Sequence, residues 1–251
     1  ISIFVMYSPD RKSQLEQMIR LNSRMIGWED ADKILLVDGE ANCHPEGFRV
    51  IEVPRPSGNF NWSKMWLVGV EESIHEKVLY LDSDRVLPIG YLEKLDKTIT
   101  DNSFVFCDSL FGLKFSVADD FVMDLVDNHT AEDLRTDFDA YKDLMYYDPR
   151  YQLPLRGPGK GVMSGNTGFT RNGFYRSGGV DPFYETHGAY ADLDFQHQVW
   201  SQGFDLVALD DLEIHLWHPK LSDSNEELTM RDIEILSLNN FVYHAKKWGL
   251  G

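Results

Sequence analysis

A short apolar run that ends in two aspartates constrains this chain more than any other segment does. Residues 78–88 read VLYLDSDRVLP, and the first four have the length and character of a buried strand. Asp82 and Asp84 follow at its carboxyl end. In open α/β sheets, ligands bind outside the carboxyl ends of the strands. Two carboxylates placed there can hold a hard divalent cation, although acids with this spacing also occur in solvated turns.

The surrounding pattern predicts an α/β fold with a mostly parallel central sheet flanked by helices. Strands are expected at residues 1–6, 34–37, 48–53 and 78–81, and helices at residues 9–26 and 63–74. Each apolar run ends in a polar residue, so Tyr7, Asp38 and the Asp82/Asp84 pair should meet at one edge of the sheet. The glycine-rich dinucleotide fingerprint and the P-loop are both missing, which argues against those two classes of nucleotide site.

Composition narrows the class of protein. The 251 residues suffice for one large domain, and 43% hydrophobic residues supply a core. A formal net charge of −17 disfavours non-specific binding to nucleic acid. No run is long and apolar enough to cross a bilayer, and no leader is visible. Cys43 and Cys107 lack metal-ligand spacing and are expected to be reduced, so the default expectation is a soluble, cytoplasmic protein.

The second half of the chain changes character twice. Residues 116–160 are acidic and then rich in Tyr, Pro and Gly, with an amphipathic helix expected through Phe121, Leu125 and Val126. A helix is expected over residues 189–202 and another over residues 224–248. Between them, FDLVALD and EIHLWHP read as two separate strands, and the second carries His215 and His218. Either histidine could complete a metal site with the acids, because neutral imidazole suits several divalent ions, or it could be purely structural.

Four segments, in order over about residues 1–219, resemble GT-A-fold nucleotide-sugar glycosyltransferases of the family-2-like kind. The segment VLYLDSDRVLP looks like their Asp-x-Asp motif, and GNFNWSKMWLVGVE resembles the helix before it. The segment running from Asn166 to Asp205 is similar to their acceptor-side motif, and EIHLWHP looks like their late metal-binding histidine. The resemblance implies a metal-dependent, inverting enzyme that uses a nucleoside-diphosphate sugar, with UDP favoured. It also implies a single GT-A domain.

The resemblance also implies roles for individual residues. Asp84, with Asp82 and one of the two histidines, would hold Mn²⁺ or Mg²⁺, which stabilises charge on the leaving diphosphate. Tyr7 and Asp38 would frame the base and ribose, and Lys64 could contact the diphosphate. The general base that deprotonates the acceptor hydroxyl would be Asp192, with Asp194 as the alternative. The expected divisions are the donor half (1–115), the acidic insertion (116–160), the acceptor half (161–222) and the C-terminal helix (223–251).

Departures from the family pattern leave alternatives open. Ala191 replaces the first acid of the usual Glu-Asp pair, and the usual Gly-Gly-Phe-Asp turn reads Gly-Gly-Val-Asp and ends at Asp181. The altered pair allows a catalytically silent nucleotide-sugar-binding module. A nucleotidyltransferase ranks behind, because it would need a basic phosphate loop near the first strand. The acceptor is expected to be a carbohydrate or glycoconjugate, with a modified base in DNA as a less favoured possibility.

Two further groups of residues invite a functional interpretation. Aromatic rings can stack on a sugar face, but core packing is the expectation for at least two of the candidates Trp62, Trp66 and Trp217. Gly157, Gly159, Gly161 and Gly165 could belong to a loop that closes over bound donor.

Overall fold

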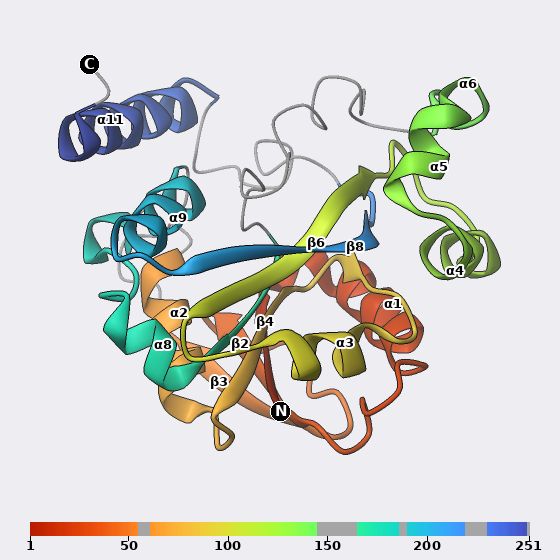
Figure 1. The fold of residues 1–251 in the computed structure, drawn as a ribbon, viewed down its shortest axis with the longest axis horizontal. Coiled ribbons are helices and arrows are strands. Elements are labelled where there is room, and N and C mark those ends of the chain that lie inside the picture. Colours follow the sequence, from red (N-terminus) through yellow and green to blue (C-terminus); the bar gives the residue numbers. More distant parts are fainter. Residues whose placement is uncertain (55–60, 145–164, 186–189, 219–229, 250–251) are drawn as a thin grey trace.

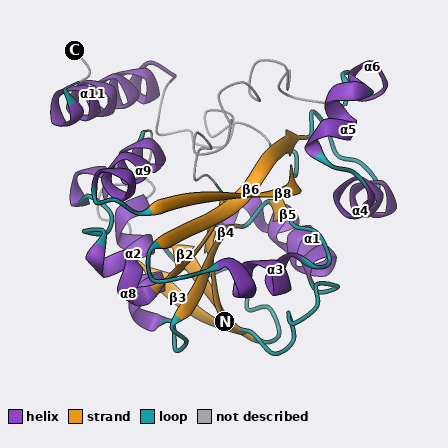
Figure 2. Cartoon of the chain, viewed as in Figure 1, coloured by secondary structure: helices purple, strands orange, loops and turns teal. Residues whose placement is uncertain are grey.

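A computed structural model describes residues 1–54, 61–144, 165–185, 190–218 and 230–249 of the chain. Gly157, Gly159 and Gly161 of the expected closing loop lie outside these residues, as do parts of the acidic insertion. Figure 1 traces the fold, and Figure 2 shows its helices packed around one central sheet. No helix among the described residues is long and apolar enough to cross a membrane.

The central sheet joins two parallel blocks through the antiparallel strand β7, in the order β3-β2-β1-β4-β7-β6-β8-β5. Strands β3, β2, β1 and β4 are mutually parallel, and β7 pairs antiparallel with β4 and with β6. Strand β8 is parallel to β6 and antiparallel to β5. The strands are β1 (Ser2–Tyr7), β2 (Asp32–Asp38), β3 (Phe48–Val53), β4 (Lys77–Asp82), β5 (Arg85–Val86), β6 (Ser103–Gly112), β7 (Asn166–Thr170) and β8 (Asp205–His215).

The helices pack on the faces and at the ends of this sheet. They are η1 (Pro9–Arg11), α1 (Lys12–Asn22), α2 (Trp62–Glu72), α3 (Tyr91–Thr98), α4 (Asp119–Asn128), α5 (Ala131–Thr136), α6 (Phe138–Tyr141), α8 (Arg171–Arg176), η3 (Pro182–Glu185), α9 (Ala191–Ser201) and α11 (Met230–Trp248). Figure 1 shows α4 to α6 beyond one end of β6 and β8, with α9 and α11 beyond the other. The predicted α/β class with a mostly parallel sheet is therefore confirmed.

Strand β1 shows why the sheet is buried on both faces. Its alternate side chains enter two different hydrophobic clusters. Val5 belongs to the cluster that contains Leu15 of α1, and Phe4 belongs to the other, where it packs against Trp66 of α2. A strand covered on both faces reads as a continuous apolar run, as this one does. Trp66 is 1% exposed and packs against aromatic rings that include Phe195, so it belongs to the core. Trp62 packs beside it, as expected for at least two of the tryptophans.

Two expected elements differ in extent. The first helix ends at Asn22 instead of reaching residue 26, and Ile26 is exposed. The segments FDLVALD and EIHLWHP, expected as two strands, form the single strand β8. Between Leu209 and Leu212 this strand carries an extra residue relative to its partner β6. A bulge of this kind bends a strand without ending it, which the local sequence pattern does not reveal.

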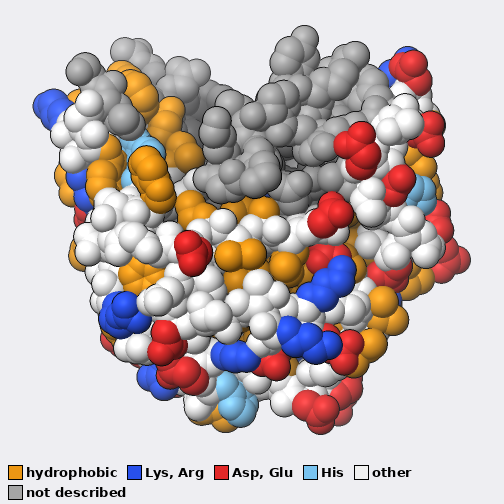
Figure 3. All heavy atoms as spheres, viewed as in Figure 1, with side chains coloured by type: hydrophobic (Ala, Val, Ile, Leu, Met, Phe, Trp, Pro, Cys, Tyr) orange, Lys and Arg blue, Asp and Glu red, His pale blue; other side chains and the backbone are white. Residues whose placement is uncertain are grey.

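Helix α11 is attached through two buried or half-buried acids, Asp181 directly before η3 and Asp194 in α9. The Asp181 carboxylate accepts hydrogen bonds from Tyr243 and Lys247, both at 2.8 Å. The Asp194 carboxylate accepts hydrogen bonds from Lys247 at 2.6 Å and from the indole of Trp248 at 2.7 Å. In Figure 3 apolar side chains gather over α9 and α11, while acids gather over α4 to α6. The C-terminal helix thus packs on the body of the protein over Met230–Trp248, and residues 224–229 of its predicted range lie outside the described residues.

Candidate metal and donor site

The Asp-x-Asp turn is held in place from two sides. The backbone N–H of Asp82 donates to the carbonyl of Gly165 at 2.7 Å, which links the end of β4 to the residue that precedes β7. The backbone N–H of Leu216 donates to the carbonyl of Asp84 at 2.8 Å. Because β5 also pairs antiparallel with the end of β8, the two histidines arrive beside the second aspartate. Segments far apart in sequence therefore meet at the carboxyl end of β4.

Three side chains converge at this point with their ligand atoms facing one another. The Nε2 atoms of His215 and His218 lie 3.5 Å and 3.4 Å from Oδ2 of Asp84. The two Nε2 atoms are 3.1 Å apart. Ligand atoms about 2.1 Å from one ion and separated by about 90–110° would lie roughly 3.0–3.4 Å from each other. The group formed by Asp84, His215 and His218 therefore fits a single divalent cation, and both histidines, not one, belong to it.

Asp84 is buried yet strongly favours its ionised form. Its side chain is only 2% exposed, and Arg11 donates to its Oδ2 at 2.6 Å. Burial by itself would raise the pKa of Asp84, but His215, Arg85 and Arg11 together hold that pKa well below its usual value. An ionised carboxylate is the form that ligates a cation. The structure thus supplies a preformed anionic ligand at this position.

Asp82 has a different environment. Its carboxylate accepts a hydrogen bond from the Tyr80 hydroxyl and lies 3.8 Å from Nε of Arg85. It is not a member of the converging group around Asp84. Burial raises the pKa of Asp82, Arg85 lowers it, and the neighbouring charge of Asp84 raises it further. The two acids of the motif therefore have different partners, and their pKa values shift in opposite directions.

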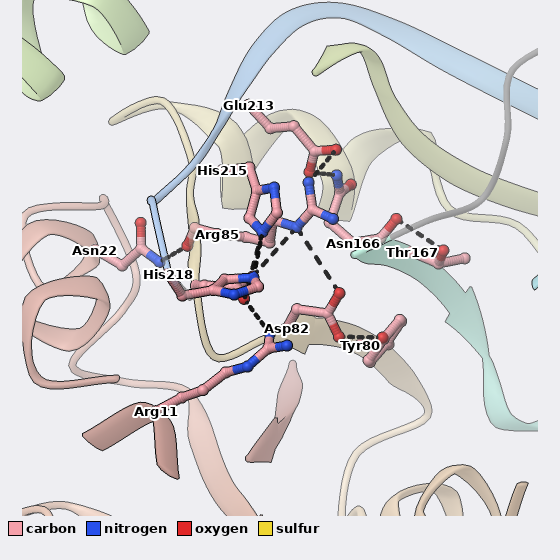
Figure 4. A network of polar contacts seen from close by, with 11 residues as sticks. Arg11, Asn22, Tyr80, Asp82, Arg85, Asn166, Thr167, Glu213, His215 and His218 are labelled. Carbon is pink, nitrogen blue, oxygen red and sulfur yellow. Dashed lines mark hydrogen bonds and ion pairs between the residues drawn. The ribbon is translucent and has the colours of Figure 1, made fainter. Parts of the chain in front are cut away.

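A buried arginine links the two acids to a third carboxylate. Figure 4 shows the Arg85 guanidinium between Glu213 and Asp82. Arg85 lies 3.6 Å from Glu213 and 3.5 Å from Oδ1 of Asp84. Asn166 donates to Glu213 and accepts from Tyr91 at 2.7 Å. We did not predict Arg11, Arg85, Glu213 or Asn166 as site residues, because no local pattern distinguishes them from other polar residues at strand ends.

The predicted donor-binding residues fall at two places. Tyr7 and Asp38 end the neighbouring parallel strands β1 and β2, and both are buried. The Tyr7 hydroxyl donates to Oδ1 of Asn42 at 2.6 Å. Lys64 is exposed in the first turn of α2, where its backbone N–H donates to the capping side chain of Asn61.

Trp217, at 37% exposed, lies between the two histidines in sequence, and its carbonyl accepts from Gln14.

The two candidate bases at the start of α9 are clearly distinguished by their surroundings. Asp194 is 1% exposed and is engaged by Lys247 and Trp248 of α11. Asp192 is only partly buried. Burial raises the pKa of Asp192, and the charge of Asp82 raises it further, which indicates that these two carboxyl groups share one electrostatic environment. Tyr190, directly before the helix, has a φ of 65°, a strained backbone conformation of the kind that clusters at functional sites.

No protein-family model matches this sequence, and no curated protein matches it. Solved structures do match. Similar structures include a mannosyltransferase, PcManGT from Pyrobaculum calidifontis, in complex with GDP-Man and Mn²⁺ (TM-score 0.60, 12% identity, 100% of this chain and 64% of that chain). GalNAc-T7 with UDP, GalNAc and Mn²⁺ is also similar (TM-score 0.58, 11% identity, 87% of this chain and 44% of that chain).

A third similar structure is S. aureus TarS 1–349 in complex with UDP-GlcNAc, with a TM-score of 0.56 and 11% identity over 94% of this chain and 64% of that chain. The aligned region thus spans 44–64% of the length of these three structures. Identities this low carry information on fold and not on substrate. The sheet order, the Asp-x-Asp turn after β4 and these three likenesses together show that the chain has a GT-A fold, as its sequence resemblance implied.

Proposed function

We propose that this protein is a metal-dependent glycosyltransferase that moves a sugar from a nucleoside-diphosphate sugar to an acceptor hydroxyl. The observation that carries the proposal is the convergence of Asp84, His215 and His218 at the carboxyl end of β4 in a GT-A fold. Three ligands on one side of an ion leave its remaining positions open for the oxygens of a diphosphate. The neighbours solved with a nucleotide or nucleotide sugar support the same class of donor.

The proposed cofactor is Mn²⁺ or Mg²⁺, held by Asp84, His215 and His218. When bound, such an ion acts as a Lewis acid that stabilises negative charge on a leaving diphosphate. Two imidazoles and one carboxylate favour Mn²⁺ over Mg²⁺, because Mg²⁺ prefers all-oxygen coordination. Asp82 stays in the proposal as a donor-side residue that could also reach the ion, although its carboxylate is directed to Tyr80 and Arg85.

Asp192 is the proposed general base, in a single displacement that inverts the anomeric carbon. Its raised pKa and its partial exposure suit a carboxylate that accepts a proton from an acceptor hydroxyl. Asp194, the alternative, already accepts two hydrogen bonds from α11, so its carboxylate is committed to holding that helix. This arrangement supports Asp192 over Asp194.

The donor is proposed to be a UDP-sugar, with its base and ribose near Tyr7 and Asp38 and its diphosphate within reach of Lys64. The acceptor is proposed to be a carbohydrate or glycoconjugate. The formal net charge of −17 disfavours the alternative acceptor, a modified base in DNA, because DNA presents a dense array of phosphates. Acids on α4 to α6 add local negative charge to the surface in Figure 3.

A catalytically silent nucleotide-sugar-binding module is the second candidate, and one observation favours it. Ala191 stands where relatives carry the first acid of the Glu-Asp pair, and it is 1% exposed in the core. Such a module would bind a nucleotide sugar without hydrolysing or transferring it. The two candidates share the metal site and differ only in turnover.

A donor screen separates these candidates. The protein is incubated with Mn²⁺ and each common UDP- or GDP-sugar, and the released nucleoside diphosphate is measured beside Asp84→Ala, Asp192→Asn and Asp194→Asn. Metal-dependent release that is lost in Asp84→Ala, and reduced about 10²- to 10⁴-fold in Asp192→Asn, supports the transferase. Donor binding without release, also in the presence of a panel of saccharide acceptors, supports the silent module. Absence of any metal-dependent nucleotide binding contradicts both.

A further inference from the structure

Arg11 and the proposed cation would use the same atom. The Nη1 atom of Arg11 lies 2.6 Å from Oδ2 of Asp84. That oxygen is also the one that faces Nε2 of His215 and of His218. A carboxylate oxygen that accepts a short, charge-assisted hydrogen bond from a guanidinium is a weaker ligand for a cation until that bond is released. In the structure, Oδ2 of Asp84 is therefore paired with a positively charged side chain of the protein itself.

The two arginines at Asp84 differ in a way that assigns them different roles. Arg85 approaches the other oxygen, Oδ1, at 3.5 Å, with its side chain 9% exposed and also paired with Glu213. Arg11 approaches Oδ2 from the η1 turn, and its side chain is 25% exposed. Arg85 is thus built into the core, whereas Arg11 reaches the site from its rim. Of the two, only Arg11 competes with a cation for the oxygen that faces the histidines.

The charges around the site give a second reason why a bound cation would displace Arg11 from Asp84. Three carboxylates, those of Asp82, Asp84 and Glu213, face the two guanidinium groups of Arg11 and Arg85. A dication placed among Asp84 and the histidines repels Arg11 at short range while it replaces its contact with Asp84. A partly exposed guanidinium released beside a bound cation is well suited to bind a phosphate oxygen, for which its planar, multiple-donor geometry is favourable.

We infer that Arg11 is an exchangeable counter-ion: it holds Oδ2 of Asp84 in the metal-free protein, yields that oxygen to the cation, and then binds the diphosphate of the donor. This inference rests on the proposed function. It makes metal binding and diphosphate binding cooperative, because each ligand favours the state in which Arg11 has left Asp84. Arg11 is therefore a positioning residue in the metal-free protein and a binding residue in the donor complex.

The test uses the full chain and two probes, Mn²⁺ alone and then UDP or GDP at saturating Mn²⁺, both followed by calorimetry. Arg11→Gln keeps hydrogen-bond donors but removes the charge. We expect Mn²⁺ to bind about three- to tenfold more tightly to Arg11→Gln, and the nucleoside diphosphate to bind about three- to tenfold more weakly. Lys12→Gln makes an equal change of charge at the next residue, where Lys12 pairs with exposed Glu16, and it should change neither affinity by more than about twofold.

Opposite changes in the two affinities distinguish this role from a structural one, which would weaken both. Unchanged or weaker Mn²⁺ binding in Arg11→Gln overturns the counter-ion role, and unchanged nucleoside-diphosphate binding overturns the phosphate role. Circular dichroism and thermal unfolding of each variant check that the fold is kept. If the wild type binds no Mn²⁺, or if Asp84→Asn binds it equally well, the proposed function fails and not merely this inference.

Discussion

Gly165 and Arg85 are in direct contact behind the Asp-x-Asp turn. A Cβ added to Gly165 would clash with the guanidinium of Arg85, and Gly165 has a φ of +75°. The buried guanidinium that pairs with Asp84 and Glu213 therefore needs a residue without a side chain at position 165. The contacts of the metal group, which comprises Asp84, His215 and His218, therefore depend on Gly165, the residue directly before β7.

Gly165→Ala should destabilise the protein and disturb the metal group. Its positive φ costs about 1–2 kcal/mol for any non-glycine residue, and the clash with Arg85 adds about 1–3 kcal/mol. Gly203→Ala is the matched control, because Gly203 has a φ of +79° and nothing within 4 Å of its added Cβ. Urea unfolding of both variants isolates the cost of the clash. Equal free energies of unfolding would contradict the tight contact.

Glu213→Gln should lower the free energy of unfolding by about 1–3 kcal/mol, because it removes one of the three carboxylates that face the buried charge of Arg85. Glu213 is 1% exposed and Arg85 is 8% exposed. The control is Arg20→Gln, which breaks the more exposed pair with Asp119 and should cost at most about 1 kcal/mol. Both values come from chemical denaturation. A cost for Glu213→Gln no larger than the control would show that the pair contributes little.

His215→Ala and His218→Ala should each weaken Mn²⁺ binding at least about tenfold, because both Nε2 atoms face Oδ2 of Asp84. Calorimetry with Mn²⁺ measures this directly. His75→Ala is the control: His75 is exposed and precedes β4, whereas the metal group follows the other end of that strand. If only one of the two site variants lost affinity, the group would supply one imidazole and not two.

Asp192→Asn should raise the thermal stability of the metal-free protein near pH 7. Folding raises the pKa of Asp192 through burial and through the charge of Asp82, so the ionised carboxylate costs stability above its unfolded pKa of about 3.9. Below that pH both states are protonated and the cost disappears. The stability difference between Asp192→Asn and the wild type should therefore grow as pH rises from about 4 towards 7.

Thermal unfolding at a series of pH values checks the sign of this effect. Asp205→Asn serves as the control, because it makes the same change of side chain at an exposed residue at the start of β8. A destabilised Asp192→Asn variant at pH 7 would contradict the raised pKa. A stabilised but inactive variant would show that the Asp192 carboxylate is needed for activity although it lowers the stability of the folded protein.

Much of the fold could be predicted because its elements carry local signals. Strands β1, β2, β3 and β4 are short apolar runs, and helices α2 and α9 were predicted within a few residues of their observed bounds. Helix α4 was expected through Phe121, Leu125 and Val126, which it contains. The break expected within β8 was wrong, because a bulge and a strand end leave similar sequence signals. Strand β7 was not predicted: its five residues, Asn166–Thr170, are mostly polar or small yet fully buried.

The candidate site could be predicted only in part. Asp84, His215 and His218 were expected as ligands from residue type and from their places at strand ends. Arg11 was not, although it contacts Asp84 at 2.6 Å, because the two residues are 73 positions apart and an arginine after a strand is ordinary on a surface. The same applies to Arg85 and Glu213, whose pairing depends on β5 meeting β8.

The sequence by itself determined the sheet-forming runs and the acids at their carboxyl ends, because these depend on residue type and local period. Only the tertiary structure decided that Asp84 joins both histidines while Asp82 turns to Tyr80, and that Asp194 holds α11 while Asp192 stays partly exposed. The physical reason is that the direction and charge of a carboxylate depend on the donors and cations around it. Here those partners come from segments that only folding brings together.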